Sequence, residues 1–165
     1  MITVRAWRSA DRAALLALDA ELREERAPRP GRRPAPAVTE PYIAALETAL
    51  DDEEGNGVLL VAETGERRLV GFLTCFVTRD GPEADRAEVT IHDLVVTRRT
   101  PRCRRGTGRL LVAAACRFAV LRGVRRVIVP TPAAHTVAAA AYRTLGFRPV
   151  AITLELDATD GYPVS

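Results

Sequence analysis

Arginines and glycines are concentrated in one short segment whose residue types and spacing could do chemistry. It consists of Arg104, Arg105, Gly106, Thr107, Gly108 and Arg109. The apolar run Val89–Val96 before it is typical of a strand, and apolar residues recur at helical spacing in Leu110–Leu121 after it. The first turn of a helix exposes unpartnered N–H donors, and glycines let a bulky anion lie against them. The segment is therefore predicted to hold a phosphate at a helix N-terminus.

The charge pattern supports an anion site at this segment rather than a generally basic surface. The net charge is only +3, which is typical of a solvated mixed surface. A nucleic-acid-binding face would spread basic residues among aromatic ones, and aromatic residues make up only 5% of the chain. We therefore expect no nucleic-acid partner. The arginines that cluster around the segment are Arg98, Arg99, Arg102, Arg104, Arg105 and Arg109.

Length and composition predict one domain over residues 1–165, with a core over 1–156 and a loose tail over 157–165. The chain is 47% hydrophobic and too short for two domains of ordinary size. No window approaches the ~18 apolar residues of a membrane span, and the N-terminus lacks a signal-peptide pattern. We expect a cytoplasmic protein without a membrane partner. Because the three cysteines lack C-x-x-C spacing and only two histidines accompany them, no metal site is expected.

The elements that must position the segment follow from periodicity, caps and turn residues. Three antiparallel strands in sequence, and then a strand–helix–strand crossover, predict a mixed sheet. The expected elements are a strand Met1–Trp7, a helix with Ser9 as N-cap running to about Arg26, a proline-rich loop Ala27–Pro41, a helix starting at Thr39 or Glu40, strands Val58–Glu63 and Leu69–Thr78, a strand Ala87–Thr97, the helix after the glycines closed by Gly123, a strand Val124–Val129, a helix Thr136–Leu145 and a strand Phe147–Leu156.

Two blocks of the sequence resemble the GCN5-related N-acetyltransferase (GNAT) superfamily. Cys103–Gly108 fits the signature [Q/R]-x-x-G-x-[G/A] at all but its first position. Further on come a short strand, His135 where many members carry Asn, the small residues Ala138–Ala141, and Tyr142–Phe147, which fits Tyr-x-x-x-Gly-Phe. The resemblance implies an α/β (α+β mixed) fold. Its sheet is mostly antiparallel with six or seven strands, is flanked by about four helices, and is splayed between the fourth and fifth strands.

The resemblance also implies acetyl-CoA as the co-substrate, with no metal. The backbone from Arg104 to Arg109 would hold the diphosphate. The pantetheine arm would pair with Leu94, Val95 and Val96, and an N–H at Val95 or Val96 would polarise the thioester carbonyl. His135 stands at a position that touches the arm in many members. Tyr142 matches the tyrosine that contacts the cofactor and can protonate the departing thiolate.

Candidate general bases lie along the strand before the segment. Glu88, Thr90 and His92 share one face by the two-residue period, and Asp93 points to the other face unless a bulge intervenes. His92 falls where several branches of the superfamily carry acid or base residues, so it is the first candidate. Glu88 is the second and Asp93 the third. The alternatives are a packing histidine and an ordinary strand-end carboxylate.

The resemblance implies transfer of an acetyl group to a primary amine of a small molecule or a protein, by direct attack in a ternary complex. A catalytically inactive module that only holds CoA is the alternative. The acceptor would be selected by the loop Ala27–Pro41 and by Asp80–Arg86, and the acidic run Asp51–Glu54 could attract a polyamine or an aminoglycoside. A homodimer is compatible with the resemblance, although no residue demonstrates one.

Overall fold

The computed structural model describes residues 1–25, 40–50, 55–79, 87–97, 101–131 and 135–151. The expected acceptor-selecting loops, the acidic run and the tail lie almost wholly outside these residues. The elements are β1 (Ile2–Ala6), a 3-10 helix η1 (Ser9–Asp11), α1 (Arg12–Glu25), α2 (Glu40–Leu50), β2 (Gly57–Thr64), β3 (Leu69–Arg79), β4 (Ala87–Val96), α3 (Pro101–Leu121), β5 (Val127–Ile128) and α4 (Thr136–Thr144).

The sheet has five strands within the described residues, in the order β1-β2-β3-β4-β5. Neighbours from β1 to β4 are antiparallel, and β5 is parallel to β4. This confirms the predicted mixed, mostly antiparallel sheet with its parallel crossover. The expected strand Phe147–Leu156 has no counterpart over residues 147–151, and the rest of it lies outside the description. The described residues therefore form five strands, against the six or seven expected for the whole sheet.

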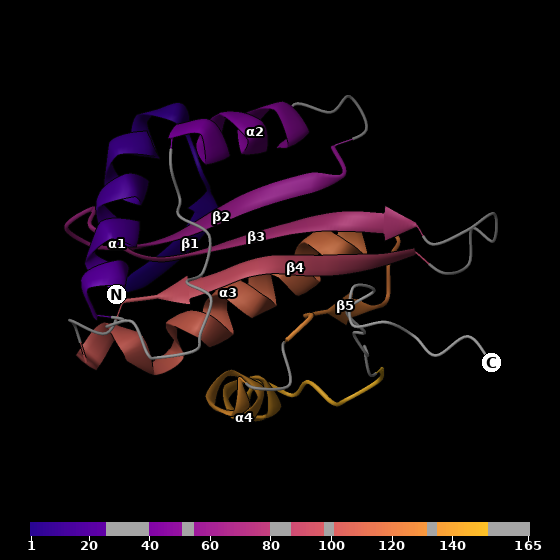
Figure 1. Cartoon of the computed structure of the whole chain (residues 1–165). Coiled ribbons are helices and arrows are strands. Elements are labelled where there is room, and N and C mark those ends of the chain that lie inside the picture. Colours follow the sequence, from indigo (N-terminus) through magenta and orange to yellow (C-terminus); the bar gives the residue numbers. More distant parts are fainter. Residues whose placement is uncertain (26–39, 51–54, 80–86, 98–100, 132–134, 152–165) are drawn as a thin grey trace, which may run out of the picture.

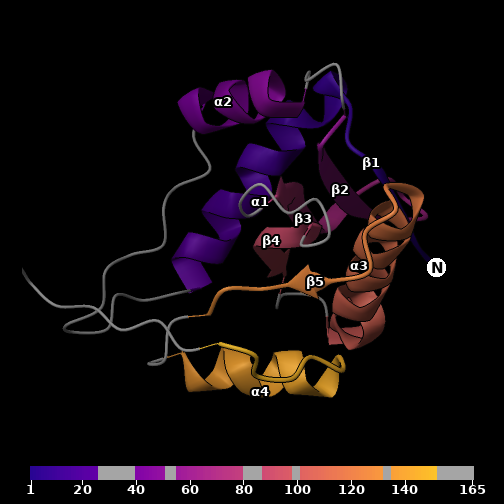
Figure 2. The same ribbon diagram turned by 90° about the vertical axis from the view of Figure 1, so that its right-hand side faces the viewer.

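Helices cover both faces of the sheet (Figure 1) and enclose two cores. On one face, α1 and α2 bury Leu15 and Ile43 against Phe72 of β3. On the other face, α3 buries Leu111 against Leu73. β3 therefore lies between two apolar layers, which explains why its sequence is a nearly continuous apolar run rather than an alternating one. Figure 2 shows α4 close to β5, at the edge of the sheet.

The first helical segment begins differently from the prediction. Arg8, not Ser9, is the N-cap, and its N–H donates a hydrogen bond of 2.8 Å to the carboxylate of Asp11. The acidic side chain three residues on thus satisfies the N–H of the cap residue itself, whereas a serine cap would have accepted from an N–H in the first turn. By contrast, α2 starts at Glu40 with Pro41 in its first turn, as predicted.

An ion-pair network joins β1, η1 and β2. Arg5 binds both carboxylate oxygens of Asp11, at 2.7 and 2.8 Å, and also binds Glu63 at 2.8 Å. The hydrogen bonds from Arg5 lower the pKa of Asp11. A depressed carboxyl pKa stabilises the fold above the unfolded-state pKa, and this contribution disappears as the pH falls through the folded-state value.

Replacing Arg5 by methionine keeps the apolar stem and removes the charge. We expect a loss of about 1–2 kcal/mol in unfolding free energy at pH 7. The loss should shrink as the pH falls below about 4, where Asp11 becomes protonated in the unfolded chain. Thermal unfolding of both proteins from pH 7 to pH 2 checks this. In an Asp11→Asn background, the Arg5→Met effect should lose part of this pH dependence. The remainder belongs to Glu63, whose pKa is also lowered by its hydrogen bond from Arg5. A dependence that is unchanged in this background would exclude Asp11 as a contributor.

Candidate active site

The helix that carries the two glycines begins earlier than the sequence predicted. α3 starts at Pro101, so the whole segment from Arg104 to Arg109 lies inside it rather than in a turn before it. Proline suits the first turn because it lacks only an N–H that would be unpartnered there. The backbone is nevertheless not regular, since Gly106 has a φ of +95°. This left-handed conformation, which favours glycine, interrupts the helical course within the signature.

The two glycines border open space, whereas the threonine between them is packed. A Cβ at Gly106 or Gly108 would meet no atom within 4 Å. Thr107 is fully buried, and its methyl group lies against Gly71 of β3. A Cβ at Gly71 would lie 2.7 Å from the carbonyl oxygen of Val95, so the absence of a side chain there lets β4 and α3 approach β3 closely. Thr107 thus fixes the segment to the sheet, and the glycines leave its outer side accessible.

The predicted splay is present beside this segment. β4 and β5 pair only at Val89 with Val127 and at Thr90 with Ile128. Beyond Thr90, no described strand pairs with that edge of β4. Leu94, Val95 and Val96 therefore lie where the two strands have separated, as the resemblance implies for the residues that pair with the pantetheine arm.

A register shift changes which residues of β4 share a face. Asp93 pairs with Thr74 and Ile91 pairs with Cys75, so His92 is an extra residue without a partner on β3. Such a bulge reverses the alternation after it. Asp93 consequently lies on the same face as Thr74 and α2. The sequence placed Asp93 on the face opposite to His92 unless a bulge intervened. The bulge is present, so that placement is corrected.

Asp93 is held by two hydroxyl groups from different elements. Tyr42 of α2 and Thr74 of β3 both donate to Oδ2, the latter at 2.7 Å. Thr74 is fully buried, and Asp93 is half-buried. Neither Tyr42 nor Thr74 was predicted from the sequence. The only signal was a threonine within an otherwise apolar strand, because a buried hydroxyl needs a hydrogen-bonding partner.

His92 is exposed, and its ring is supported from the sheet. The edge of the ring contacts Phe76, with ring centroids 5.4 Å apart and planes at 88°. Phe76 in turn lies over Gly57 of β2, where a Cβ would overlap the phenyl ring. The sheet thus holds the imidazole in place while leaving it exposed to solvent.

Glu88 lies near the opposite end of β4. Its side chain is 20% exposed and forms an ion pair of 3.5 Å with Arg126. Four residues of strand separate it from His92, which corresponds to about 13 Å. Glu88 thus forms an ion pair near the end of the strand, as the alternative interpretation expected, and it does not lie close to His92 and Asp93.

The remaining predicted residues lie on α4. His135 is the N-cap of this helix. Tyr142 is half-buried, and its ring meets Phe147 edge-on with centroids 5.7 Å apart. Figure 2 shows α4 beneath β5 and therefore on the side of the splay opposite to α1 and α2. The side chains of Arg104 and Arg105 are outside the description, and Arg109 is exposed.

The described cysteines offer no reactive thiolate at the splay. Burial, with a smaller effect from Cys116, raises the pKa of Cys75 to about 12. Cys116 is exposed on α3. Among the described residues, no group of three or more His, Cys, Asp and Glu side chains could hold a metal ion. None of the described helices is long and apolar enough to cross a membrane.

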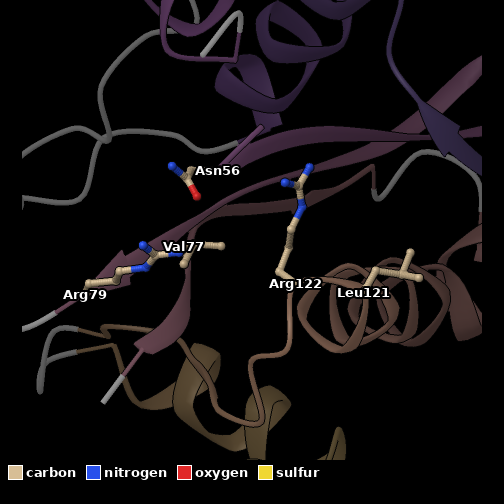
Figure 3. Close-up of a pocket in the computed structure, with 5 residues that line it drawn as sticks. All are labelled: Asn56, Val77, Arg79, Leu121 and Arg122. Carbon is tan, nitrogen blue, oxygen red and sulfur yellow. The ribbon is translucent and has the colours of Figure 1, made fainter. Parts of the chain in front are cut away.

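A cavity of about 490 Å³ lies away from the splay (Figure 3). It is lined by Asn56, Val77, Arg79, Leu121 and Arg122. Arg79 pairs with Ala87, at the end of β4 opposite to Val96. The cavity therefore belongs neither to the splay nor to the glycine segment.

Comparisons with known proteins identify the class to which this fold and site belong. A model of the acetyltransferase (GNAT) family matches residues 18–147, so the chain belongs to this family. Comparison with curated protein sequences gave no significant match.

Several solved structures share the fold. One is a transcriptional regulator from Bacillus halodurans C-125, with 24% identity and a TM-score of 0.70, covering 95% of this chain and 99% of the other. Another is AAC(6')-Iy with the bisubstrate analogue CoA-S-monomethyl-acetylneamine, with 18% identity and a TM-score of 0.71, covering 95% and 97%. A third is glucosamine-6-phosphate N-acetyltransferase from Arabidopsis thaliana, with 16% identity and a TM-score of 0.68, covering 96% and 99%.

Proposed function

We propose that this protein transfers the acetyl group of acetyl-CoA to a primary amine in a ternary complex. The observation that carries the proposal is the splay between β4 and β5, with accessible glycines of α3 on one side and His92 and Asp93 on the α2 face. A thioester in the splay and an amine arriving from the α2 side would meet at the bulge. Family membership and the CoA bisubstrate analogue bound by AAC(6')-Iy support the same co-substrate.

The glycine segment is suited to the diphosphate. A Cβ-free backbone with open space beside it accommodates a bulky anion, the positive φ of Gly106 interrupts the helical course there, and the arginines of the segment supply positive charge. The side chain of Arg109 is exposed and available for this contact. Each such contact contributes about 0.3–2 kcal/mol, so affinity comes from their sum rather than from one arginine.

His92 is proposed as the general base. An alkyl ammonium with a pKa near 10.4 is neutral in about one molecule in a few thousand at pH 7, so removal of its proton assists attack. The imidazole takes this proton, and the amine nitrogen attacks the thioester carbonyl carbon. The C–S bond then breaks, and the CoA thiolate takes a proton from Tyr142 or from water. The second proton that the nitrogen loses as it becomes an amide restores this donor, and the imidazolium releases the first proton to solvent. No enzyme nucleophile is needed in this scheme.

The acceptor is proposed to be a small-molecule or protein amine. Amino sugars are a reasonable first class to test, because one similar structure is a glucosamine-6-phosphate N-acetyltransferase and another holds an acetylneamine analogue. Metal is not required by the proposed steps. A cytoplasmic location and a homodimer remain predictions.

An amine panel tests the proposal. The purified chain is incubated with acetyl-CoA and glucosamine 6-phosphate, neamine, spermidine, tyramine or a lysine peptide, and release of the CoA thiol is followed together with the mass of the product. We expect at least one amine to gain one acetyl group. If CoA binds in calorimetry and a broad panel yields no acetylated product, the chain is a CoA-binding module instead. If CoA does not bind, both functions are wrong.

A further inference from the structure

The carboxylate of Asp93 has an arrangement that the proposed chemical steps do not use. Both described hydroxyl donors, from Tyr42 and Thr74, act on the same oxygen, Oδ2. No described residue donates to Oδ1 or forms an ion pair with this carboxylate. The charge is therefore oriented by neutral groups, and one oxygen is left for a partner that is not part of the described protein.

The position of this carboxylate suits an incoming amine. Asp93 directly follows His92, which is the unpaired residue of the bulge, and the two side chains lie on the same face of the sheet. It also precedes Leu94–Val96, where β4 has separated from β5. An amine bound at Oδ1 would therefore lie close to the proposed base, at the part of β4 that has separated from β5.

We propose that Asp93 binds the protonated amine of the acceptor as an ammonium ion, with Tyr42 and Thr74 as positioning residues. This inference rests on the proposed function and specifies its acceptor class. The bound ammonium donates a hydrogen bond to Oδ1, and another of its protons passes to His92 before attack. Asp93 keeps its charge throughout, so the step is a proton transfer from nitrogen to imidazole.

The arrangement selects among acceptors by charge. A charge-assisted hydrogen bond to a carboxylate favours a cation over a neutral group of the same shape. A second carboxylate close to the amine, as in a free α-amino acid, would lie near Asp93 and be repelled. The preferred acceptors are therefore cationic amines without an adjacent carboxylate.

Steady-state kinetics of Asp93→Asn provide the first test, with the best amine of the panel. Asparagine retains an oxygen that can accept from Tyr42 and Thr74, so the local packing is kept while the charge is lost. We expect the KM for the amine to rise about 10- to 100-fold, with a smaller change in kcat and with the KM for acetyl-CoA and the Tm unchanged.

Two positioning variants and one control accompany it. Tyr42→Phe and Thr74→Val each remove one hydroxyl donor with little change in shape, and each should raise the KM for the amine about 3- to 10-fold. Glu66→Gln removes an exposed carboxylate at the β2–β3 turn and should have no effect. An unchanged amine KM in Asp93→Asn, or an equal rise in Glu66→Gln, would overturn the proposal.

A binding measurement separates this proposal from the proposed function. Butylammonium and its neutral analogue 1-butanol are titrated into the ¹⁵N-labelled chain in the presence of CoA. Butylammonium should shift the backbone amide signals of Thr74, His92 and Asp93 in the parent and not in Asp93→Asn, and 1-butanol should not. This result in a chain that acetylates no amine would retain the ammonium site and reject the enzyme. No shift at these amides in the parent would reject the site, even in an active enzyme.

Discussion

Replacing His92 by alanine is expected to lower kcat for the amine by about 10²- to 10⁴-fold, the usual contribution of a general base. The imidazole is exposed and held against Phe76, on the face of the sheet that carries Asp93. Its loss should leave the affinity for CoA and the Tm close to those of the parent, because the side chain is not part of either core. Stopped-time product assays at saturating acetyl-CoA measure the effect.

Chemical rescue distinguishes a base from a residue that only shapes the site. In His92→Ala, the space beside Phe76 is open to solvent, so added imidazole should restore part of the activity. His92→Gln, which fills that space with a polar group that is not a base, should be slow and should not be rescued. Glu88→Ala provides the competing test: if it abolishes turnover while His92→Ala does not, Glu88 is the base and our assignment is wrong.

The second large effect is expected at Gly108. Replacing it by leucine should weaken CoA binding about 10- to 100-fold, because the side chain would occupy the space into which the diphosphate is proposed to fit. Stability should not fall, since a glycine within a helix costs about 1 kcal/mol relative to alanine and leucine is a good helix former. The φ of Gly108 is not positive, and a Cβ there meets nothing within 4 Å. Calorimetric titration with CoA checks the expected loss of affinity, and a Tm measurement checks that stability does not fall.

Two neighbouring variants control for the backbone. Gly108→Ala should bind CoA nearly as the parent does, because the family signature accepts alanine at this position. Gly106→Ala should instead lose about 1–2 kcal/mol of stability, since its φ of +95° is strained for any residue with a Cβ. If Gly108→Leu binds CoA as tightly as the parent, the diphosphate lies elsewhere.

The order of strands and helices was predictable because it depends on local patterns. Apolar periodicity located β2, β3 and β4 to within one or two residues, and Gly123, with a φ of +70°, ends α3 where a C-cap was predicted. The boundaries failed where a longer-range or alternative partner was decisive. Ser9 was expected as the N-cap, but Arg8 is the cap and its N–H is bound by Asp11. The start of α3 at Pro101 was not predicted from the glycines.

The candidate site was predicted only in part, for a specific physical reason. His92, the glycine segment and Leu94–Val96 were predicted from residue type, sequence position and the resemblance, and their roles stay predictions. The face of Asp93 was not, because a single unpaired residue reverses a two-residue alternation and its position depends on how β4 aligns with β3. Tyr42 was missed because it lies 51 residues away from Asp93 in the chain.

The amino-acid sequence by itself thus determined the family, the succession of elements and the glycine signature at the start of α3, since each is encoded by residues close together in the chain. The tertiary structure alone decided which carboxylate stands beside His92 and which hydroxyl groups hold it. Strand register and helix docking bring those atoms together, and neither leaves a mark on the local pattern of residues.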